Sequence, residues 1–167
     1  MTARYILYTD GSFYHKNHQK TVSAYIVLDE DGNLVCKGRS FVVPQKKGMQ
    51  SSTMAELRAV IIGLKAIRKL DNDHLTSVNV LTDYQGLPVF HKYLRRYKKN
   101  QYVKEVVKQR LKQAVWSWYY SNLMHTMKCY ESMQKELQLT VSWVKAHSDN
   151  AWNNEVDQLA KRSIGKG

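Results

Sequence analysis

This chain of 167 residues has little proline and glycine and no long apolar run, and these absences exclude several classes of protein. It holds only 2 prolines and 8 glycines, so its composition does not favour a disordered chain. No apolar run approaches the roughly 18 residues that span a bilayer. The opening residues, MTARYILYTD, reach an acidic side chain too soon for a signal peptide. We therefore expect one domain over residues 1–167, located in the cytoplasm and without a membrane partner.

Cysteine and acidic residues are also scarce. Cys36 and Cys129 fit no metal-binding spacing, so we expect two reduced thiols. Lys and Arg number 26 against 14 Asp and Glu, which gives a net charge of +12. Such a surface attracts polyanions, of which nucleic acid is the commonest in a cell. Solubility alone and an anionic membrane surface are the alternatives.

Hydrophobic periodicity predicts an α/β fold. Stretches of strand length come first, and apolar residues recur at helical spacing after residue 50. The predicted strands are 4–9, 21–28, 34–43, 77–82 and 139–145, and the predicted helices are 51–70, 152–163 and most of 89–136. The first three strands form an antiparallel meander, after which strands alternate with helices. This order predicts a mixed sheet with helices packed on it.

Two of the predicted strands end on the same dipeptide, Thr-Asp. The stretch YTDGS places Asp10 after the first strand, and LTDYQG places Asp83 after the fourth. If these strands pair in parallel, both carboxylates lie at one edge of the sheet, where α/β proteins bind ligands. Taken singly, Asp10 also fits an Asp-Gly turn and Asp83 a helix N-cap.

Three further residues are candidates for the same edge. Glu56 lies in the first turn of helix 51–70, although Thr53 and Glu56 also fit a capping box. Asp157 lies on the flank of the closing helix, where the helix dipole alone would favour an acidic residue. His147 follows the last strand in WVKAHSDN and is otherwise an ordinary polar surface residue.

Four carboxylates in one cleft would repel one another unless a cation neutralised them. Ligands that are all oxygen suit Mg²⁺ or Mn²⁺. Two such ions, about 4 Å apart, can stabilise the attacking and leaving oxygens of an in-line phosphodiester displacement. An acidic pocket in a basic protein is therefore what a metal-dependent nuclease requires.

The motifs YTDGS, MAELRAV, LTDYQG, WVKAHS and NNEVDQLAK resemble, in this order, those of type 1 ribonuclease H. The resemblance covers about residues 4 to 163. It implies an α/β, ribonuclease H-like fold, with a five-stranded mixed sheet in the order 3-2-1-4-5 flanked by helices and a basic helical protrusion. It also implies hydrolysis of the RNA strand of RNA–DNA hybrids by two metal ions, Mg²⁺ or Mn²⁺, leaving 5′-phosphate and 3′-hydroxyl ends. The implied metal-binding set is Asp10, Glu56, Asp83 and Asp157, with His147 as a further catalytic residue.

The resemblance also implies contacts with the substrate. Gly11, Ser12 and Gln85 match positions beside the metals, where the 2′-hydroxyl of RNA would be recognised. Ser51 and Ser52 stand where the family commonly has Thr-Asn. Ser51 can still donate to a DNA phosphate, but Ser52 cannot make the pair of hydrogen bonds that asparagine makes.

A basic and then aromatic insert occupies about residues 89–136. Its first part, 92–112, holds nine Lys and Arg against one acidic residue and resembles the family's basic protrusion, which grips DNA phosphates. A solvated helix face is the alternative. In the aromatic part, 113–136, Trp116 is a candidate for stacking on a nucleotide, with helix packing or a protein partner as the alternatives. The basic side chains taken as substrate contacts are Arg95, Arg96, Lys98 and Lys99.

Other functions stay open at the level of sequence. A transposase or integrase core shares the wider fold, but Glu56 on the first helix and Asp157 on the last favour the ribonuclease pattern. A catalytically silent nucleic-acid-binding module would have no reason to keep four mutually repulsive carboxylates. Attachment of the 92–112 segment to a membrane surface is the third alternative. We expect a monomer that binds an RNA–DNA hybrid.

Overall fold

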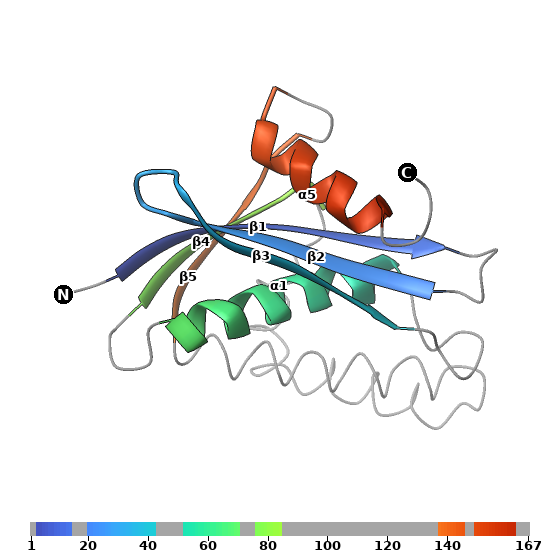
Figure 1. The fold of residues 1–167 in the computed structure, drawn as a ribbon, viewed down its shortest axis with the longest axis horizontal. Coiled ribbons are helices and arrows are strands. Elements are labelled where there is room, and N and C mark those ends of the chain that lie inside the picture. Colours follow the sequence, from blue (N-terminus) through green and yellow to red (C-terminus); the bar gives the residue numbers. More distant parts are fainter. Residues whose placement is uncertain are drawn as a thin grey trace, which may run out of the picture.

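The computed structural model describes residues 3–14, 20–42, 52–70, 76–84, 137–145 and 149–162 (Figure 1). The elements are β1 (Ala3–Tyr14), β2 (Lys20–Asp29), β3 (Leu34–Val42), α1 (Ser52–Leu70), β4 (Thr76–Thr82), β5 (Leu137–Trp143) and α5 (Ala151–Arg162). The predicted helical insert over 89–136 lies outside the described residues, so its basic protrusion stays a prediction.

The sheet has five strands in the order β3-β2-β1-β4-β5, which confirms the expected 3-2-1-4-5 arrangement. β1 pairs with β2 and β2 with β3 in antiparallel fashion, while β1 pairs with β4 and β4 with β5 in parallel. The sheet is therefore mixed, and its parallel half begins where the chain crosses over through α1.

The turn between β2 and β3 follows from its sequence, DEDGN. The Asp29 carboxylate accepts hydrogen bonds from the backbone N–H groups of Asp31 and Asn33, at 3.0 Å and 2.9 Å. Gly32 has a φ of 85°, a conformation that costs little only for glycine. These contacts close the hairpin and fix the register of the edge strand.

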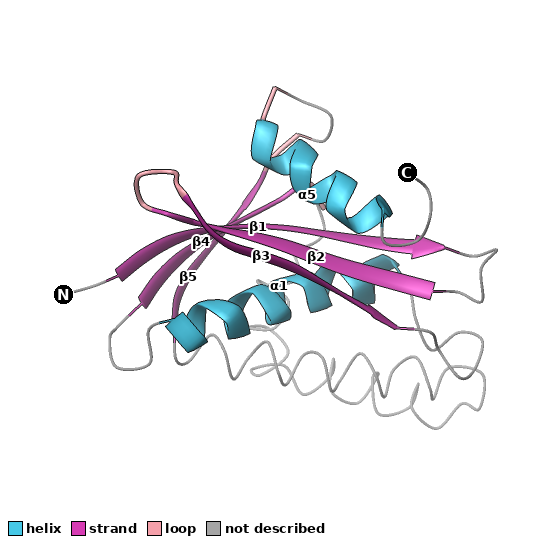
Figure 2. Cartoon of the chain, viewed as in Figure 1, coloured by secondary structure: helices cyan, strands magenta, loops and turns pink. Residues whose placement is uncertain are grey.

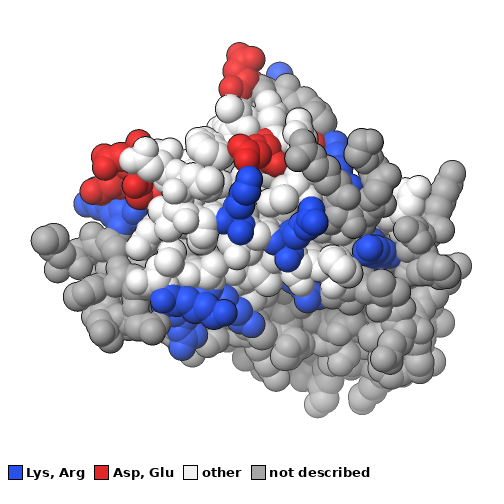
Figure 3. Space-filling view, in the orientation of Figure 1, with Lys and Arg blue, Asp and Glu red and all other residues white. Residues whose placement is uncertain are grey.

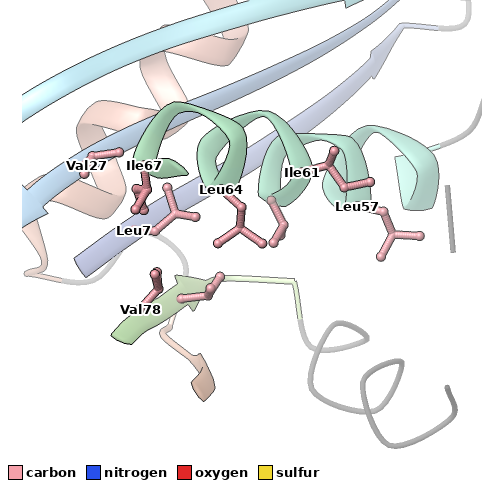
Figure 4. Close-up of a cluster of buried hydrophobic side chains, with 9 residues drawn as sticks. Leu7, Val27, Leu57, Ile61, Leu64, Ile67 and Val78 are labelled. Atoms are coloured by element: carbon pink, nitrogen blue, oxygen red, sulfur yellow. The ribbon is translucent and has the colours of Figure 1, made fainter. Parts of the chain in front are cut away.

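The two described helices cover opposite faces of the sheet (Figure 2). On the α1 face, the apolar residues that recur at helical spacing after residue 50 are all buried. They pack against apolar side chains of β1, β2 and β4 (Figure 4). The helix contributes Leu57, Val60, Ile61, Leu64 and Ile67, and the strands contribute Leu7, Val27, Val78 and Val80.

On the other face, α5 packs against β1 and β2. Val156 and Ala160 are fully buried among side chains that include Tyr8 and Ile26, and Leu159 is partly buried. The apolar stripe of α5 therefore points to the sheet, as is usual for a helix with one apolar face. In the described ranges, neither helix is long and apolar enough to cross a membrane.

β1 is longer than predicted, and Asp10 lies within the strand rather than after it. The sequence predicts that the strand ends at Thr9, with an Asp-Gly turn as one alternative for Asp10. Instead β1 runs on to Tyr14, with Asp10 opposite Ala24. Because the pairing with β2 continues past Asp10, the alternative of an Asp-Gly turn is wrong.

Candidate metal centre

Asp10 and Asp83 lie side by side because the two Thr-Asp dipeptides are in register. The parallel ladder between β1 and β4 ends with Thr9 opposite Thr82, and each aspartate is the next residue. Neighbouring strands lie about 4.8 Å apart, so the carboxylates come close. Both threonine residues are fully buried, so the two strands are held in place at the position just before each aspartate.

Hydrogen bonds also hold the backbone around Asp83. The Tyr84 N–H donates to the Thr82 hydroxyl at 3.0 Å, and the indole N–H of Trp143 donates to the Asp83 carbonyl at 3.1 Å. The Val144 N–H donates to the Thr82 carbonyl at 2.8 Å. The end of β5 therefore supports the segment that carries Asp83.

Asp157 completes a group of three carboxylates. One oxygen each from Asp10, Asp83 and Asp157 lies within 4.8 Å of the other two. Asp157 comes from α5, where the preceding residue, Val156, is buried against β1 and β2. The packing of α5 on the sheet thus carries Asp157 to the strand carboxylates, and a hydrogen bond joins its side chain to that of Asp10.

The N-terminus of α5 is capped by an asparagine that also contacts β1. The Asn150 side-chain oxygen accepts a hydrogen bond from the Asn153 N–H at 3.0 Å. Its amide nitrogen donates to the Tyr8 hydroxyl at 3.1 Å. Tyr8 lies two residues before Asp10, so Asn150 connects the helix that carries Asp157 to the strand that carries Asp10.

Glu56 lies beside Asp10 but outside the group of three. It is buried in α1, four residues after the first residue of the helix, and its side chain hydrogen-bonds to that of Asp10. The Gly11 N–H donates to the carboxyl groups of both residues. The capping-box alternative depends on the Thr53 side chain, which lies outside what the structure describes, so it stays a prediction.

Burial and mutual repulsion make full ionisation of these carboxyl groups costly. Burial, followed by the charges of Asp83 and Asp157, raises the pKa of Asp10 to about 8. Burial, followed by the charges of Asp10 and Asp83, raises the pKa of Glu56 to about 10. The hydrogen bonds from Gly11 act in the opposite direction but are weaker.

These observations fit a divalent cation. Among the described residues, the Glu56 Oε2 atom is buried and has no hydrogen-bond partner. Crowded carboxylates need positive charge if all are to ionise, and carboxylate oxygens are the ligands that Mg²⁺ and Mn²⁺ prefer. The arrangement therefore suits a metal centre of Asp10, Asp83, Asp157 and Glu56.

Lys161 was not singled out from the sequence. Its ammonium nitrogen lies 2.8 Å from Asp157 Oδ2, one turn further along α5. The hydrogen bond to Asp157 raises the pKa of Lys161. The signal that could have found it is the spacing of four residues between an acid and a base on a helix.

The predicted substrate contacts are only partly described. Gly11 and Ser12 lie in β1 immediately after Asp10, and Ser52 is the first residue of α1. The remaining predicted residues lie outside the described ranges. They are Ser51, Gln85, Arg95, Arg96, Lys98, Lys99, Trp116 and His147.

A sheet in this order, with acidic side chains within β1, directly after β4 and on α5, defines a ribonuclease H-like α/β fold. The model of the RNase H family matches residues 2–164, and the chain belongs to this family. A comparison with functionally curated proteins finds no match.

Solved structures share the fold at low sequence identity. RNase H1 from the halophilic archaeon Halobacterium salinarum superposes with a TM-score of 0.63 at 14% identity, covering 98% of this chain and 99% of that one. LC11-RNase H1, in complex with an RNA/DNA hybrid, gives a TM-score of 0.61 at 16% identity over 96% and 99% of the chains. The prototype foamy virus protease-reverse transcriptase gives a TM-score of 0.64 at 18% identity, covering 96% of this chain and 20% of that one.

Proposed function

We propose that this protein is an endoribonuclease that hydrolyses the RNA strand of RNA–DNA hybrids, leaving 5′-phosphate and 3′-hydroxyl ends. The observation that carries the proposal is the convergence of Asp10, Asp83 and Asp157 within 4.8 Å, beside buried Glu56. Membership of the RNase H family supports the reaction class. The similar fold of LC11-RNase H1, whose structure contains an RNA/DNA hybrid, supports the substrate.

The metal ions of the proposed site are Mg²⁺, two per site, with Mn²⁺ as a substitute. Asp10, Glu56, Asp83 and Asp157 would hold them. When bound, divalent ions supply a Lewis acid for the phosphodiester and a means of activating water. His147, outside the described residues, stays the predicted further catalytic residue.

The residues of the chain itself fix the carboxylates before metal binds. The Gly11 N–H orients the Asp10 and Glu56 carboxyl groups together. When the site holds no cation, Asp10 retains a proton near neutral pH and shares hydrogen bonds with Glu56 and Asp157. A site arranged in advance needs little reorganisation at the moment of reaction.

Basic side chains on the described surface support binding of a polyanion. In the view of Figure 3 they gather along α1 and near β3, while acidic side chains lie on α5 and at the turn after β2. The last turn of α1 carries Arg68 and Lys69. With a net charge of +12, this surface would hold phosphates while the acidic cluster holds metal.

The test uses end-labelled RNA–DNA hybrid, duplex RNA and duplex DNA, each with Mg²⁺, Mn²⁺ or EDTA. Metal-dependent cutting confined to the RNA strand of the hybrid is the expected result, and analysis of the product ends should find 5′-phosphate. Hybrid binding without cutting would instead indicate a catalytically silent binding module. Joining of DNA ends would indicate a transposase or integrase core.

A further inference from the structure

The backbone of α1 lies directly on β1 next to the acidic cluster. A Cβ atom built on Gly11 would lie 2.4 Å from both Ala55 C and Glu56 N, and 2.8 Å from Ala55 O. Only a residue without a side chain allows this approach. The peptide bond that joins Ala55 to Glu56 is therefore seated on Gly11, one residue from Asp10.

A second contact holds the same peptide bond from the neighbouring strand. Ser23 is the cross-strand partner of Gly11 in the pairing of β1 with β2. Its hydroxyl group donates a hydrogen bond to the Ala55 carbonyl at 2.8 Å, and only 1% of Ser23 is exposed. Gly11 on β1 leaves room for this peptide bond to pack on the strand, and Ser23 on β2 holds its carbonyl group by the hydrogen bond.

We propose that Ser23 is a positioning residue for Glu56. By holding the Ala55 carbonyl, it fixes the first turn of α1, and with it the Glu56 carboxyl group relative to Asp10. None of the motifs that indicate the family includes Ser23, which lies in an ordinary strand. The proposal rests on the proposed role of Glu56 at the metal centre.

The chain offers a matched control in Ser40. Ser40 pairs with Ser23 across β2 and β3, and its hydroxyl group accepts a hydrogen bond from the Arg58 guanidinium at 3.0 Å. This contact joins the same sheet to the same helix. It involves the Arg58 side chain rather than the peptide bond at Glu56, so its loss should leave the Glu56 carboxyl group in place.

The experiment is a titration of metal-free protein with Mn²⁺ in the absence of nucleic acid. Ser23→Ala is expected to weaken Mn²⁺ binding about 10-fold, because partners that orient metal ligands typically have effects of this size. Ser40→Ala should change the affinity less than twofold. Circular dichroism and thermal unfolding establish that each variant is folded.

A double-mutant cycle shows whether Ser23 acts through Glu56. If it does, Ser23→Ala should weaken Mn²⁺ binding little further in the Glu56→Gln background. Equal effects of Ser23→Ala and Ser40→Ala, or an undiminished effect in that background, would overturn the proposal. Should Ser23→Ala fail to fold, Ser23→Cys keeps the shape with a weak donor and is judged by the same criteria.

The Mn²⁺ titration separates this inference from the proposed function. If the wild-type protein binds Mn²⁺ but cleaves no hybrid, the proposed reaction fails and the titration still decides the role of Ser23. If the wild-type protein binds no Mn²⁺, both fail. Where cleavage occurs, Ser23→Ala should lower kcat and leave KM for the hybrid unchanged, as expected for a residue that acts only on the metal ligands.

Discussion

Thr9 and Thr82 lie opposite each other as the last pair of the parallel ladder between β1 and β4. Both strands continue into an aspartate, so the register of one pair of buried threonines sets the distance between Asp10 and Asp83. The two carboxylates are therefore close because of strand pairing rather than because of a local turn.

Replacement of Asp10 by asparagine should abolish metal-dependent cleavage and leave hybrid binding largely intact. Asparagine keeps the shape of the side chain but removes the charge that a divalent cation requires. Cleavage assays and binding measurements in EDTA check the two parts of this prediction. The exposed Asp149, replaced in the same way, is the control and should retain activity. Normal cleavage by the Asp10 variant would contradict the assignment of the metal ligands.

The stability of the metal-free protein should fall as the pH rises. The pKa of Asp10 is raised from 3.8 to about 8, and that of Glu56 from 4.5 to about 10, so the folded protein binds more protons than the unfolded chain between these values. The resulting contribution to the free energy of unfolding is complete below about pH 4. It is lost progressively as the pH rises towards 8 for Asp10 and towards 10 for Glu56.

Thermal unfolding in EDTA from pH 5 to pH 9 measures this dependence. The double variant Asp10→Asn, Glu56→Gln should show a shallower decline than the wild type, because its amides do not titrate. Addition of Mn²⁺ at pH 8 should stabilise the wild type and leave the double variant unchanged. Identical profiles for the two proteins would show that the buried carboxyl groups do not control the pH dependence.

Much of the fold was predictable from the sequence, because apolar periodicity identifies the strands and α1 directly. The repeated Thr-Asp dipeptide predicted that Asp10 and Asp83 are neighbours. The end of β1 was not predictable, because Asp-Gly favours a turn locally, whereas pairing of residues 11–14 with β2 extends the strand. Long-range pairing outweighs the local preference here.

The supporting contacts of the site could not be read from the sequence. Ser23 acts through a hydrogen bond to a residue 32 positions away, and nothing in the pattern of β2 distinguishes it from other strand serines. Asn150 had a local signal, since asparagine before a helix is a common N-cap. Its bond to Tyr8 depends on how α5 packs on the sheet, which periodicity does not specify.

Gly11→Ala should disturb the site more than any other glycine substitution in the described strands. The new methyl group would meet the backbone of Ala55 and Glu56 at 2.4 Å, so α1 must move away from β1. Overpacking of this kind costs about 1–3 kcal/mol of stability and should displace Glu56. Chemical denaturation and Mn²⁺ titration measure the two effects.

Gly38→Ala is the matched control for that substitution. A Cβ atom at Gly38 would also be crowded, but its nearest neighbour is the end of the Tyr25 side chain at 2.6 Å. A side chain can rotate away where a helix backbone cannot. The Gly38 variant should therefore lose less stability and keep its affinity for Mn²⁺. Weaker Mn²⁺ binding by the Gly38 variant than by the Gly11 variant would contradict the view that packing of α1 on Gly11 positions Glu56.

Asn150→Ala should weaken the metal centre through α5. It removes the N-cap, which typically contributes about 1 kcal/mol, and the hydrogen bond to Tyr8 that joins α5 to β1. Because Asp157 depends on the position of α5, affinity for Mn²⁺ should fall together with stability. Tyr8→Phe removes only the bond between helix and strand and leaves the cap in place. We expect Tyr8→Phe to reduce Mn²⁺ affinity with a smaller loss of stability, and unchanged affinity in both variants would show that packing of Val156 and Ala160 alone positions Asp157.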